Sequence, residues 1–460
     1  MILKILNKIK KKYLNKIDYL TKTYFNKGVI IYPNNLLTYL RFDITAKTLY
    51  ARHRIKKVEK VIAKKVYEHH INVWNGFNEL APPKKNKEEF YQSFHNLLKS
   101  FKNNSYQYSR SSIYLDKKGK LINGAHRTAA AITYNKSLNF KKKSYIQGQS
   151  FCSSNYFLNK KDICKKGLRT DYADLMALEY IYLKSNIYMI TLFDHGLSKV
   201  DIIYEILKNL KINLVYEKNI ELSKNGILNY LITLYYGESW IGNIKDGFIG
   251  VHNKYNYCFS NGSRMKVLLV ECNNRIECVK AKETIRTMIG KGKHSIHTTD
   301  TKIETWRNAT TVFNKNTLNF LNQCKIGSFY NNRIKKMIKA AKLIMQLNQV
   351  RSEDYCVAGS AILDLYGLRL CADFDILYYP NEKKIKFNSI INTHNNYIEY
   401  YENSLEEMIY HPQNYLYFDG IKFSSLDQIF KMKNKRYEEK DLADILMIKA
   451  NKESLNKKID

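Results

Sequence analysis

Hydrophobic and polar positions follow two periods along this chain, and the period changes several times. In residues 1–20, apolar side chains recur at spacings of three and four, which predicts an amphipathic helix whose other positions are mostly lysine. From Ser111, apolar residues alternate around a Lys-Lys-Gly turn, which predicts a β-hairpin. Asn123-Gly124 then leads into an alanine-rich helix. The mixture of helical and strand patterns predicts an α+β protein.

The second half of the chain continues this mixture in two blocks. The block from about residue 186 to 321 combines strand and helix patterns. The next block begins with a basic helix and then reads YCVAGSAILDLYGLRLCADFDILYY. Its pattern predicts a short helix that opens at a Gly-Ser pair, and then a strand that carries Asp373 and Asp375 on one face.

A chain of 460 residues suggests two to four domains, each large enough to bury a hydrophobic core. No internal repeat and no low-complexity linker separates them, so the boundaries follow the changes of pattern. The prediction is a basic N-terminal helical region at 1–65 and three mixed α/β domains at 66–184, 185–328 and 329–460.

The formal net charge is +34, which favours anionic partners such as nucleotides, nucleic acid or an acidic membrane surface. A second interpretation is that the lysines are background in a composition that is also rich in asparagine, isoleucine and tyrosine. The basic helix of residues 1–20 can lie on an anionic inner membrane face or pack on its own domain. Nucleic acid and a peripheral membrane contact therefore both stay among the expected partners.

Hydrophobic residues make up 45% of the chain, which is a globular composition rather than a disordered one. None of the eight cysteines belongs to a Cys-x-x-Cys pair, so we expect reduced and mostly buried thiols in a cytoplasmic protein. The sequence shows no signal peptide and no apolar run of about 18 residues, so we expect no membrane span.

The first motif that carries chemistry is Asn-Gly-Ala-His-Arg at residues 123–127. Gly124 precedes the first turn of a helix, whose free N–H groups attract anions, and Arg127 can grip a phosphate at two points. The alternative is an ordinary helix start in which Arg127 pairs with a carboxylate. The stretch resembles the ParB/sulfiredoxin-type fold, whose signature ends in Gly-x-His-Arg. This resemblance implies that Gly124, His126 and Arg127 bind nucleotide phosphates, although Asn123 stands where the family usually has Asp.

The second motif is His-Ser-Ile-His at residues 294–297, followed by Thr-Thr-Asp. A metal site, a nucleophilic histidine and a pair of buried structural histidines are three interpretations of this pattern. On a strand, His294 and His297 would point to opposite faces, and no cysteine or carboxylate cluster with ligand spacing lies nearby. The pattern therefore argues against metal binding and leaves the other two interpretations open.

The stretch around this motif resembles the C-terminal half of nucleoside diphosphate kinases. The resemblance rests on elements that occur in the family's order, which are Tyr235-Tyr236, Thr284-Ile285-Arg286, His297, Asp300, Glu304 and Phe313. It implies a ferredoxin-like fold in which His297 attacks a phosphoryl group, Arg286 stabilises charge and Glu304 holds the imidazole. Phe193 replaces the family's phosphate-binding lysine, which favours another acceptor or nucleotide binding alone.

The third motif joins a Gly-Ser pair to an Asp-x-Asp strand. Two carboxylates on one strand face repel unless a cation neutralises them, so Asp373 and Asp375 predict a Mg²⁺ site. Gly359 and Ser360 at a helix start can hold a triphosphate. Asp419 is the candidate for a third metal-binding carboxylate, although it precedes a glycine and can instead be a turn residue. The alternative interpretation makes the aspartates solvated residues of a strand edge.

This arrangement resembles the nucleotidyltransferase superfamily, whose pattern is Gly-Ser followed by Asp-h-Asp on a strand, where h is hydrophobic. The resemblance implies that a hydroxyl attacks the α-phosphate of an NTP and releases pyrophosphate. The later stretch looks like the helical tail of small members of that superfamily, with Lys440, Asp441 and Asp444 on one helix.

Two functions from different classes fit these motifs. The first is a nucleotide-dependent transferase that uses Mg²⁺ and ATP or another NTP to phosphorylate or nucleotidylate an unidentified acceptor. Surface-polysaccharide or nucleotide-sugar biosynthesis is one role considered for it. The second is a non-catalytic nucleotide-binding or nucleic-acid-associated regulatory protein with degenerate catalytic domains. The sequence shows no zinc finger and no evident helix-turn-helix, so the transferase is the first hypothesis.

Overall fold

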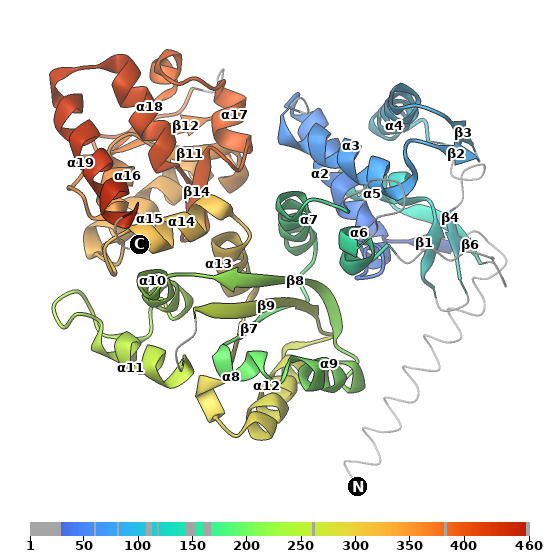
Figure 1. The fold of residues 1–460 in the computed structure, drawn as a ribbon. Helices are drawn as coiled ribbons and strands as arrows, with labels where there is room; N and C mark the ends of the chain where they lie inside the picture. The colour runs from blue at the N-terminus through green and yellow to red at the C-terminus, as the bar shows by residue number, and fades with distance from the viewer. Residues whose placement is uncertain are drawn as a thin grey trace, which may run out of the picture. The chain divides into compact units, whose positions relative to one another are not determined.

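The computed structural model describes residues 29–58, 61–80, 82–106, 113–116, 119–142, 152–159, 167–259, 263–380 and 384–456. The amphipathic helix predicted for residues 1–20 lies outside these ranges. The chain forms two compact units, residues 1–56 with 66–168 and residues 57–65 with 169–460. Each unit contains both helices and strands, so the α+β prediction is confirmed at this level (Figure 1). No helix in the described part of the chain is both long and apolar enough to cross a membrane.

The first unit is built on a four-stranded sheet of order β1-β6-β4-β5, and the β-hairpin predicted from Ser111 onward is its β4–β5 pair. The strands are β1 (Val29–Ile31), β4 (Ile113–Leu115), β5 (Leu121–Asn123) and β6 (Leu138–Lys142). A two-stranded ribbon joins β2 (Glu79–Leu80) to β3 (Pro83–Lys84). The helices are η2 (Pro33–Leu36), α2 (Asp43–Ile55), α3 (Ile62–Asn75), α4 (Lys87–Lys102), α5 (Ala125–Thr133) and α6 (Ser154–Asn159). The predicted alanine-rich helix is α5.

The second unit holds two sheets, and the first of them is antiparallel throughout. Its order is β10-β7-β9-β8, made of β7 (Ile187–Leu192), β8 (Asn213–Glu221), β9 (Arg264–Glu271) and β10 (Ile296–Thr298). Numbered along the chain, the strand order is therefore 4-1-3-2. The helices between strands are α8 (Asp194–Leu197), α9 (Val200–Asn209), α10 (Lys224–Leu234), η3 (Ser239–Ile241), α11 (Ile249–Cys258), α12 (Arg275–Ile289) and η4 (Gly292–His294).

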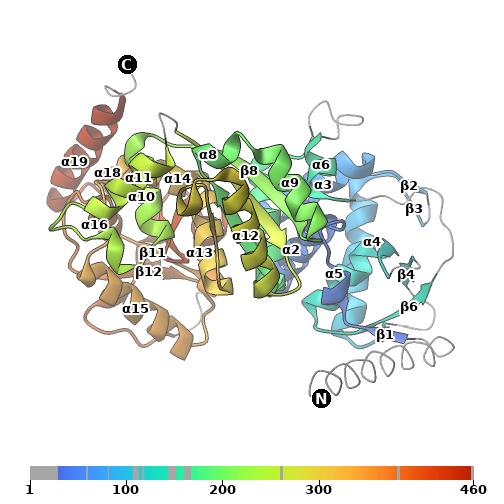
Figure 2. The ribbon, with the colours of Figure 1, turned by 90° about the horizontal axis from the view of Figure 1, so that it is seen from below.

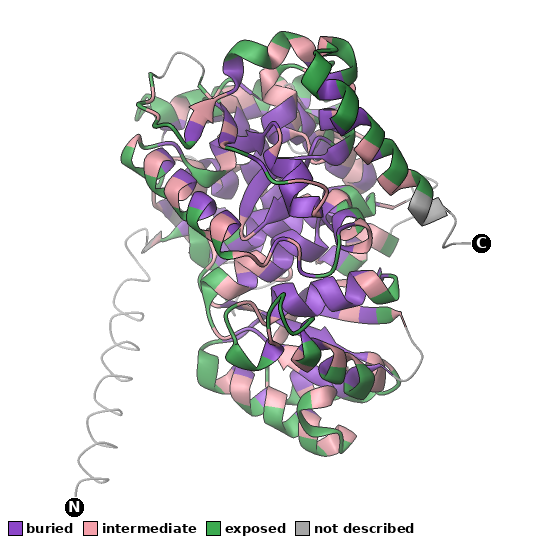
Figure 3. Cartoon of the chain, turned by 90° about the vertical axis from the view of Figure 1, so that its left-hand side faces the viewer, coloured by how far each residue is buried: buried purple, intermediate pink, exposed green. Residues whose placement is uncertain are grey.

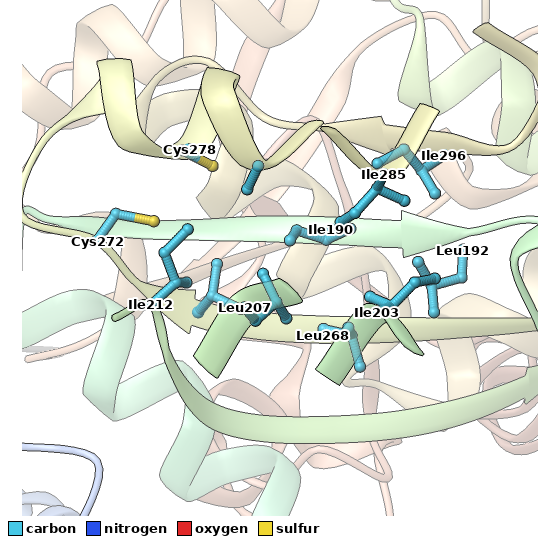
Figure 4. Packing of buried hydrophobic residues seen from close by; sticks show 12 residues of the cluster. Ile190, Leu192, Ile203, Leu207, Ile212, Leu268, Cys272, Cys278, Ile285 and Ile296 are labelled. Carbon is cyan, nitrogen blue, oxygen red and sulfur yellow. The ribbon is translucent and has the colours of Figure 1, made fainter. Parts of the chain in front are cut away.

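Helices α9 and α12 cover one face of this antiparallel sheet, as the view from below shows (Figure 2). Their apolar stripes meet strand side chains that point to the same face, because alternate residues of a strand share a face. Ile190 and Leu268 from the strands lie against Ile203 and Ile285 from the helices (Figure 4). Each of these four side chains is fully buried, so this face is a closed core rather than a binding surface.

The second sheet of this unit is mixed, with order β13-β12-β11-β15-β14. Its strands are β11 (Tyr355–Ala358), β12 (Phe374–Tyr378), β13 (Ile391–Thr393), β14 (Tyr415–Phe418) and β15 (Ile421–Ser424). The pairs β11–β12 and β14–β15 are antiparallel, and the pairs β11–β15 and β12–β13 are parallel. The surrounding helices are α15 (Asn332–Leu347), η5 (Ser352–Asp354), α16 (Ala361–Tyr366), η6 (Asn395–Tyr400), α17 (Leu405–Tyr410), α18 (Leu426–Arg436) and α19 (Glu439–Asn456).

Three further helices of the second unit are α7 (Thr170–Leu183), α13 (Lys302–Val312) and α14 (Lys315–Gln323). Helices α13 and α14 join the two sheets of the unit. The Thr317 hydroxyl accepts a hydrogen bond of 2.8 Å from the Tyr417 amide, and the Trp306 indole donates one of 3.3 Å to the Gly420 carbonyl. Buried residues continue along the strands and inner helix faces of the unit (Figure 3). The predicted domains 185–328 and 329–460 thus lie in one compact unit, which also includes α7.

Replacing Ile190 with alanine should lower the free energy of unfolding by about 2–5 kcal/mol, because the lost methyl groups leave a cavity between β7 and the helices. Ile276→Ala is the matched control, since that isoleucine is 79% exposed on α12, and it should change stability by less than about 0.5 kcal/mol. Urea unfolding followed by circular dichroism measures both. Equal effects of the two changes would contradict the packing described for this face.

Candidate functional site

The paired aspartates lie at the point where β11 ends and α16 begins. Gly359 follows β11 with a φ of +64°, and a Cβ atom on it would lie 2.1 Å from Oδ2 of Asp375. Ala358, the residue before it, is paired with Asp375 across the β11–β12 ladder. Glycine is required here for both reasons, since a side chain would collide with the carboxylate and strain the backbone. Ser360 directly precedes α16, as the Gly-Ser pattern predicted, and its side chain makes no capping hydrogen bond.

Asp373 directly precedes β12 and Asp375 lies within it, so the two carboxylates share a face as predicted. Oδ2 of Asp373 accepts a hydrogen bond of 2.9 Å from the Asn392 amide. Burial, and next the charge of Asp373, raise the pKa of Asp375 to about 6. Ionisation of Asp375 is therefore less favourable than that of an ordinary aspartate, and a cation would favour it.

A buried histidine lies beside this pair, and the sequence analysis did not single it out. Nδ1 of His394 is 3.7 Å from Oδ2 of Asp375, and neither ring nitrogen of His394 makes a hydrogen bond. Burial, followed by the charges of Arg436 and Lys433, lowers the pKa of His394 to about 4. His394 is thus neutral near pH 7 and does not neutralise Asp375.

Positive charge reaches the aspartates from α18 and α19. Arg436, Lys433 and Lys440 each oppose the rise in the pKa of Asp375. Lys433 is itself buried and donates to Asp441 at 2.7 Å and lies 2.8 Å from Asp444. Burial alone would raise the pKa of Asp441, but hydrogen bonds from Arg436 and Lys433 lower it to about 2. The predicted trio of Lys440, Asp441 and Asp444 does lie on one helix, α19, where the two aspartates pair with cations.

The structure corrects the assignment of Asp419 as a third metal-binding carboxylate. Strands β11 and β15 run parallel, with Val357 beside Phe423, and Asp419 lies in the turn before β15. That turn is at the amino end of β11, whereas Gly359 and Asp375 are at its carboxyl end. Asp419 has a φ of +46° and accepts a hydrogen bond of 2.5 Å from Lys342. It is therefore a turn residue in an ion pair at the opposite end of the sheet.

Of the residues that the structure describes, no three His, Cys, Asp or Glu side chains are grouped to hold a metal ion. The Asp373–Asp375 pair still fits Mg²⁺, which proteins often bind through one or two carboxylates together with water and substrate phosphates. The raised pKa of Asp375 supports this fit, because a divalent cation would relieve the repulsion and the desolvation that raise it.

His297 lies in the middle of β10, opposite Thr191 of β7. Its Nε2 is 3.0 Å from Oε1 of Glu304, and the ring of Tyr235 stands edge-on at 5.0 Å. Burial alone would raise the pKa of Glu304, but hydrogen bonds with His297 and the Asp300 amide lower it overall. Because Glu304 engages Nε2, the lone pair of a neutral ring is at Nδ1, for which the described residues supply no hydrogen bond.

A lysine from another element lies where the expected strand lysine is missing. The ammonium of Lys254 on α11 is 5.6 Å from the ring of Phe193 and 5.5 Å from the ring of Tyr235. It donates a hydrogen bond of 2.5 Å to the carbonyl of Lys293. Burial lowers the pKa of Lys254, and the helix α11 that carries it comes from the segment between β8 and β9. No local pattern in the sequence points to this lysine, because only the folded chain brings it to Phe193.

The remaining predicted residues of this motif separate into two environments. Arg286, in the last turn of α12, reaches the His297 strand through the Ile296 carbonyl at 3.5 Å, and its Nε is buried without a hydrogen bond. His294 ends η4 before the strand begins and packs against the ring of Tyr257 at 4.8 Å. Burial, and next Lys254, lower the pKa of His294. The two histidines therefore form no common metal site.

In the first unit, the residues of the first motif line one cleft of about 590 Å³, together with Lys84 and Asn123. Gly124 has a φ of +112°, and a Cβ atom there would lie 2.6 Å from Cγ2 of Ile113. Nε2 of His126 is 2.9 Å from the hydroxyl of Tyr67, and burial lowers the pKa of His126 well below its usual value. Burial therefore keeps His126 neutral near pH 7, and Arg127 at the same cleft supplies positive charge.

Comparison of the chain with family models, with curated protein sequences and with solved structures gave no match. The three resemblances therefore rest on short motifs and on the geometry around them.

The sequence analysis also missed Lys433 and Arg436 as neighbours of Asp375. Their signal was present, because two cations three residues apart on one helix are followed by two aspartates three apart on the next. That spacing places each pair on one helix face. The sequence did not show that these faces meet each other beside Asp375.

Asp375→Asn should stabilise the metal-free protein above about pH 6 by about 1–2 kcal/mol, after allowance for solvent screening. The pKa of Asp375 is about 6 in the folded chain against an ordinary value of 3.8, so the wild type loses stability as pH rises through this window. The D375N variant, whose amide does not ionise, does not lose this stability. Thermal unfolding at pH 4 and pH 7.5 in EDTA measures the difference, with the exposed Asp201→Asn as control. An equal effect of D375N at both pH values would contradict the raised pKa.

Proposed function

We propose that the chain is a nucleotidyltransferase that uses an NTP and Mg²⁺ at the Asp373–Asp375 pair. The observation that carries the proposal is the close approach of Asp375 to Gly359, which places a carboxylate of raised pKa beside a second one where β11 ends and α16 begins. A side chain at position 359 would displace the Asp375 carboxylate, so the glycine allows the carboxylate to lie close to the start of α16, where backbone N–H groups attract phosphate. Its residue types and order also match the superfamily pattern.

The proposed reaction joins an acceptor hydroxyl to the α-phosphorus of the NTP. An O–P bond forms, the bond from the α-phosphorus to the bridging oxygen breaks, and pyrophosphate leaves with its electron pair. A bound Mg²⁺ supplies Lewis-acid polarisation of the phosphate oxygens. Asp373 and Asp375 hold it, Gly359 and Ser360 admit the triphosphate, and the hydroxyl proton passes to a carboxylate or to water.

A second candidate activity is phosphoryl transfer through His297. The observation that favours it is the 3.0 Å contact between Nε2 of His297 and Glu304. The 4-1-3-2 antiparallel sheet with the α10–α11 pair inserted between β8 and β9 also supports a ferredoxin-like, nucleoside diphosphate kinase-like arrangement. In this step Nδ1 attacks the γ-phosphorus, an N–P bond forms, and the NDP leaves. The Nε2 proton stays on the hydrogen bond to Glu304.

The cleft at Gly124, His126 and Arg127 supports nucleotide binding in the first unit as a further part of this proposal. The non-catalytic alternative draws its support from two observations. The metal pair lacks a third carboxylate in the described part of the chain, and Phe193 occupies the place of the phosphate-binding lysine. The acceptor stays unidentified, so the tests below include binding as well as transfer.

Incubation with α-³²P-labelled NTPs and Mg²⁺ should label an acceptor or release pyrophosphate, and Asp373→Asn or Asp375→Asn should lower the rate by about 100-fold or more. Titration with a non-hydrolysable NTP tests the site without an acceptor, and its Mg²⁺-dependent affinity should fall in the same variants. The matched control is Asp427→Asn, an exposed aspartate of α18 that pairs with Lys431 and Lys452. Mg²⁺-dependent binding that survives in D375N would reject this site.

Incubation with γ-³²P-labelled ATP should place an acid-labile label on the protein if His297 is a phosphoryl carrier. His297→Ala should abolish this label, and Glu304→Gln should slow its formation by about 10- to 100-fold, because the imidazole loses the partner that fixes its tautomer. His252→Gln on α11 is the control for losing an unrelated histidine. A label that persists in H297A would assign the chemistry elsewhere, and a label absent from the wild type would remove this candidate activity.

A further inference from the structure

A second cleft of the C-terminal unit is separate from both proposed reaction sites. It has a volume of about 650 Å³ and lies where α13 meets α15 and the β14–β15 turn. Asp419 and Gly420 in its wall belong to the end of the sheet opposite Asp375. Helix α13 reaches His297 through Glu304, whereas Ile303, Trp306 and Arg307 of the same helix line the cleft.

Three cations line this cleft, and two of them are engaged by carboxylates. Lys342 pairs with Asp419, and Arg351 pairs with Glu353 at 3.4 Å and with Asp354 at 3.0 Å. Arg307 forms no ion pair and donates no side-chain hydrogen bond to any described residue. Its Nε is buried without a partner, and its guanidinium carbon lies 5.5 Å from the ring centre of Tyr236.

Arg307 is therefore a cation of the cleft wall that no carboxylate of a described residue pairs with. The terminal N–H groups of a guanidinium match the oxygens of a phosphate or carboxylate. Tyr236 holds the guanidinium by a cation–π contact on one side, so Arg307 is oriented before any ligand binds. Because the other two cations of the wall are paired with carboxylates, the one unpaired cation matches one anionic group.

The rest of the wall suits a flat ring with polar edges. The indole of Trp306 is fixed by its hydrogen bond to the Gly420 carbonyl, and Tyr182 and Ile303 add apolar surface. Gln346 and Gln349 of the same wall carry amides that can donate to and accept from the edge of a base. Aromatic faces of this kind stack on nucleobases without regard to base identity.

We propose that this cleft binds a nucleoside monophosphate, with the phosphate on Arg307 and the base beside Trp306. The proposal does not rest on nucleotidyl transfer at Asp375 or on a phosphohistidine at His297. It assigns a ligand site to a cleft that neither activity uses.

Trp306 gives a local test, because the chain has three tryptophans and Trp74→Phe/Trp240→Phe leaves it as the single indole. Titration of this protein with AMP, GMP, CMP and UMP, without Mg²⁺, should quench Trp306 fluorescence in a saturable way for at least one of them. Arg307→Gln should weaken that binding about ten- to hundredfold, and Arg307→Lys should weaken it less. Arg264→Gln, an exposed arginine at the start of β9, should leave it unchanged.

Several results would overturn the proposal. One is that none of the four nucleotides quenches Trp306 fluorescence in a saturable way at millimolar concentration. Another is that R307Q binds the nucleotide as tightly as the single-tryptophan protein does. If adenosine binds as tightly as AMP, Arg307 does not bind the phosphate. If inorganic phosphate binds as tightly as AMP, the base contributes nothing to binding. If R307Q unfolds, the nucleotide affinity of R307K tests the proposal instead, because lysine keeps the charge and loses the bidentate contact with phosphate. Repeating the titration in D375N separates this site from the transferase site. Loss of function at Asp375 would leave the quenching of Trp306 unchanged.

Discussion

The C-terminal unit depends on a network of buried ion pairs between α18, α19 and the loop before β12. Lys433, Asp441 and Asp444 are each almost completely buried, and the network is closed by Arg436 and Arg369. Charges without partners in this position would cost several kcal/mol each, so the helices can pack only in the register that pairs them. The network thus fixes the position of α18, and with it the cations whose charge reaches Asp375.

This constraint explains why the negative charge of the Asp373–Asp375 pair is only partly compensated by nearby cations. Lys433 already forms ion pairs with Asp441 and Asp444. Its charge therefore offsets only part of the rise in the pKa of Asp375 that burial causes. His394 adds no charge, because burial keeps its pKa at about 4. A divalent cation bound to the pair would relieve the repulsion and the desolvation that raise the pKa of Asp375.

Local sequence patterns were enough to predict the elements that carry the site. The β4–β5 hairpin, the helix after Gly124, the strand of Asp375 and the short helix after Ser360 all appear where periodicity and turn residues placed them. His297 and Glu304 are seven residues apart, so one turn and one helix bring them together. The prediction of Asp419 as a third metal-binding carboxylate was wrong, because its position depends on β15 running parallel to β11, and no local pattern encodes that pairing. Lys254 was missed for the same reason, since it reaches Phe193 only through tertiary packing.

Helix α13 connects the histidine and the unpaired arginine in a way that has an electrostatic consequence. Glu304 and Arg307 are three residues apart and so lie on neighbouring positions of the helix surface. The charge of Arg307 helps to lower the pKa of Glu304, after the contributions from His297 and the Asp300 amide. An anion held by Arg307 would cancel part of that charge and raise the pKa of Glu304. Occupancy of the cleft by an anion and the protonation of Glu304, which is hydrogen-bonded to His297, must therefore be linked, and the linkage acts in both directions.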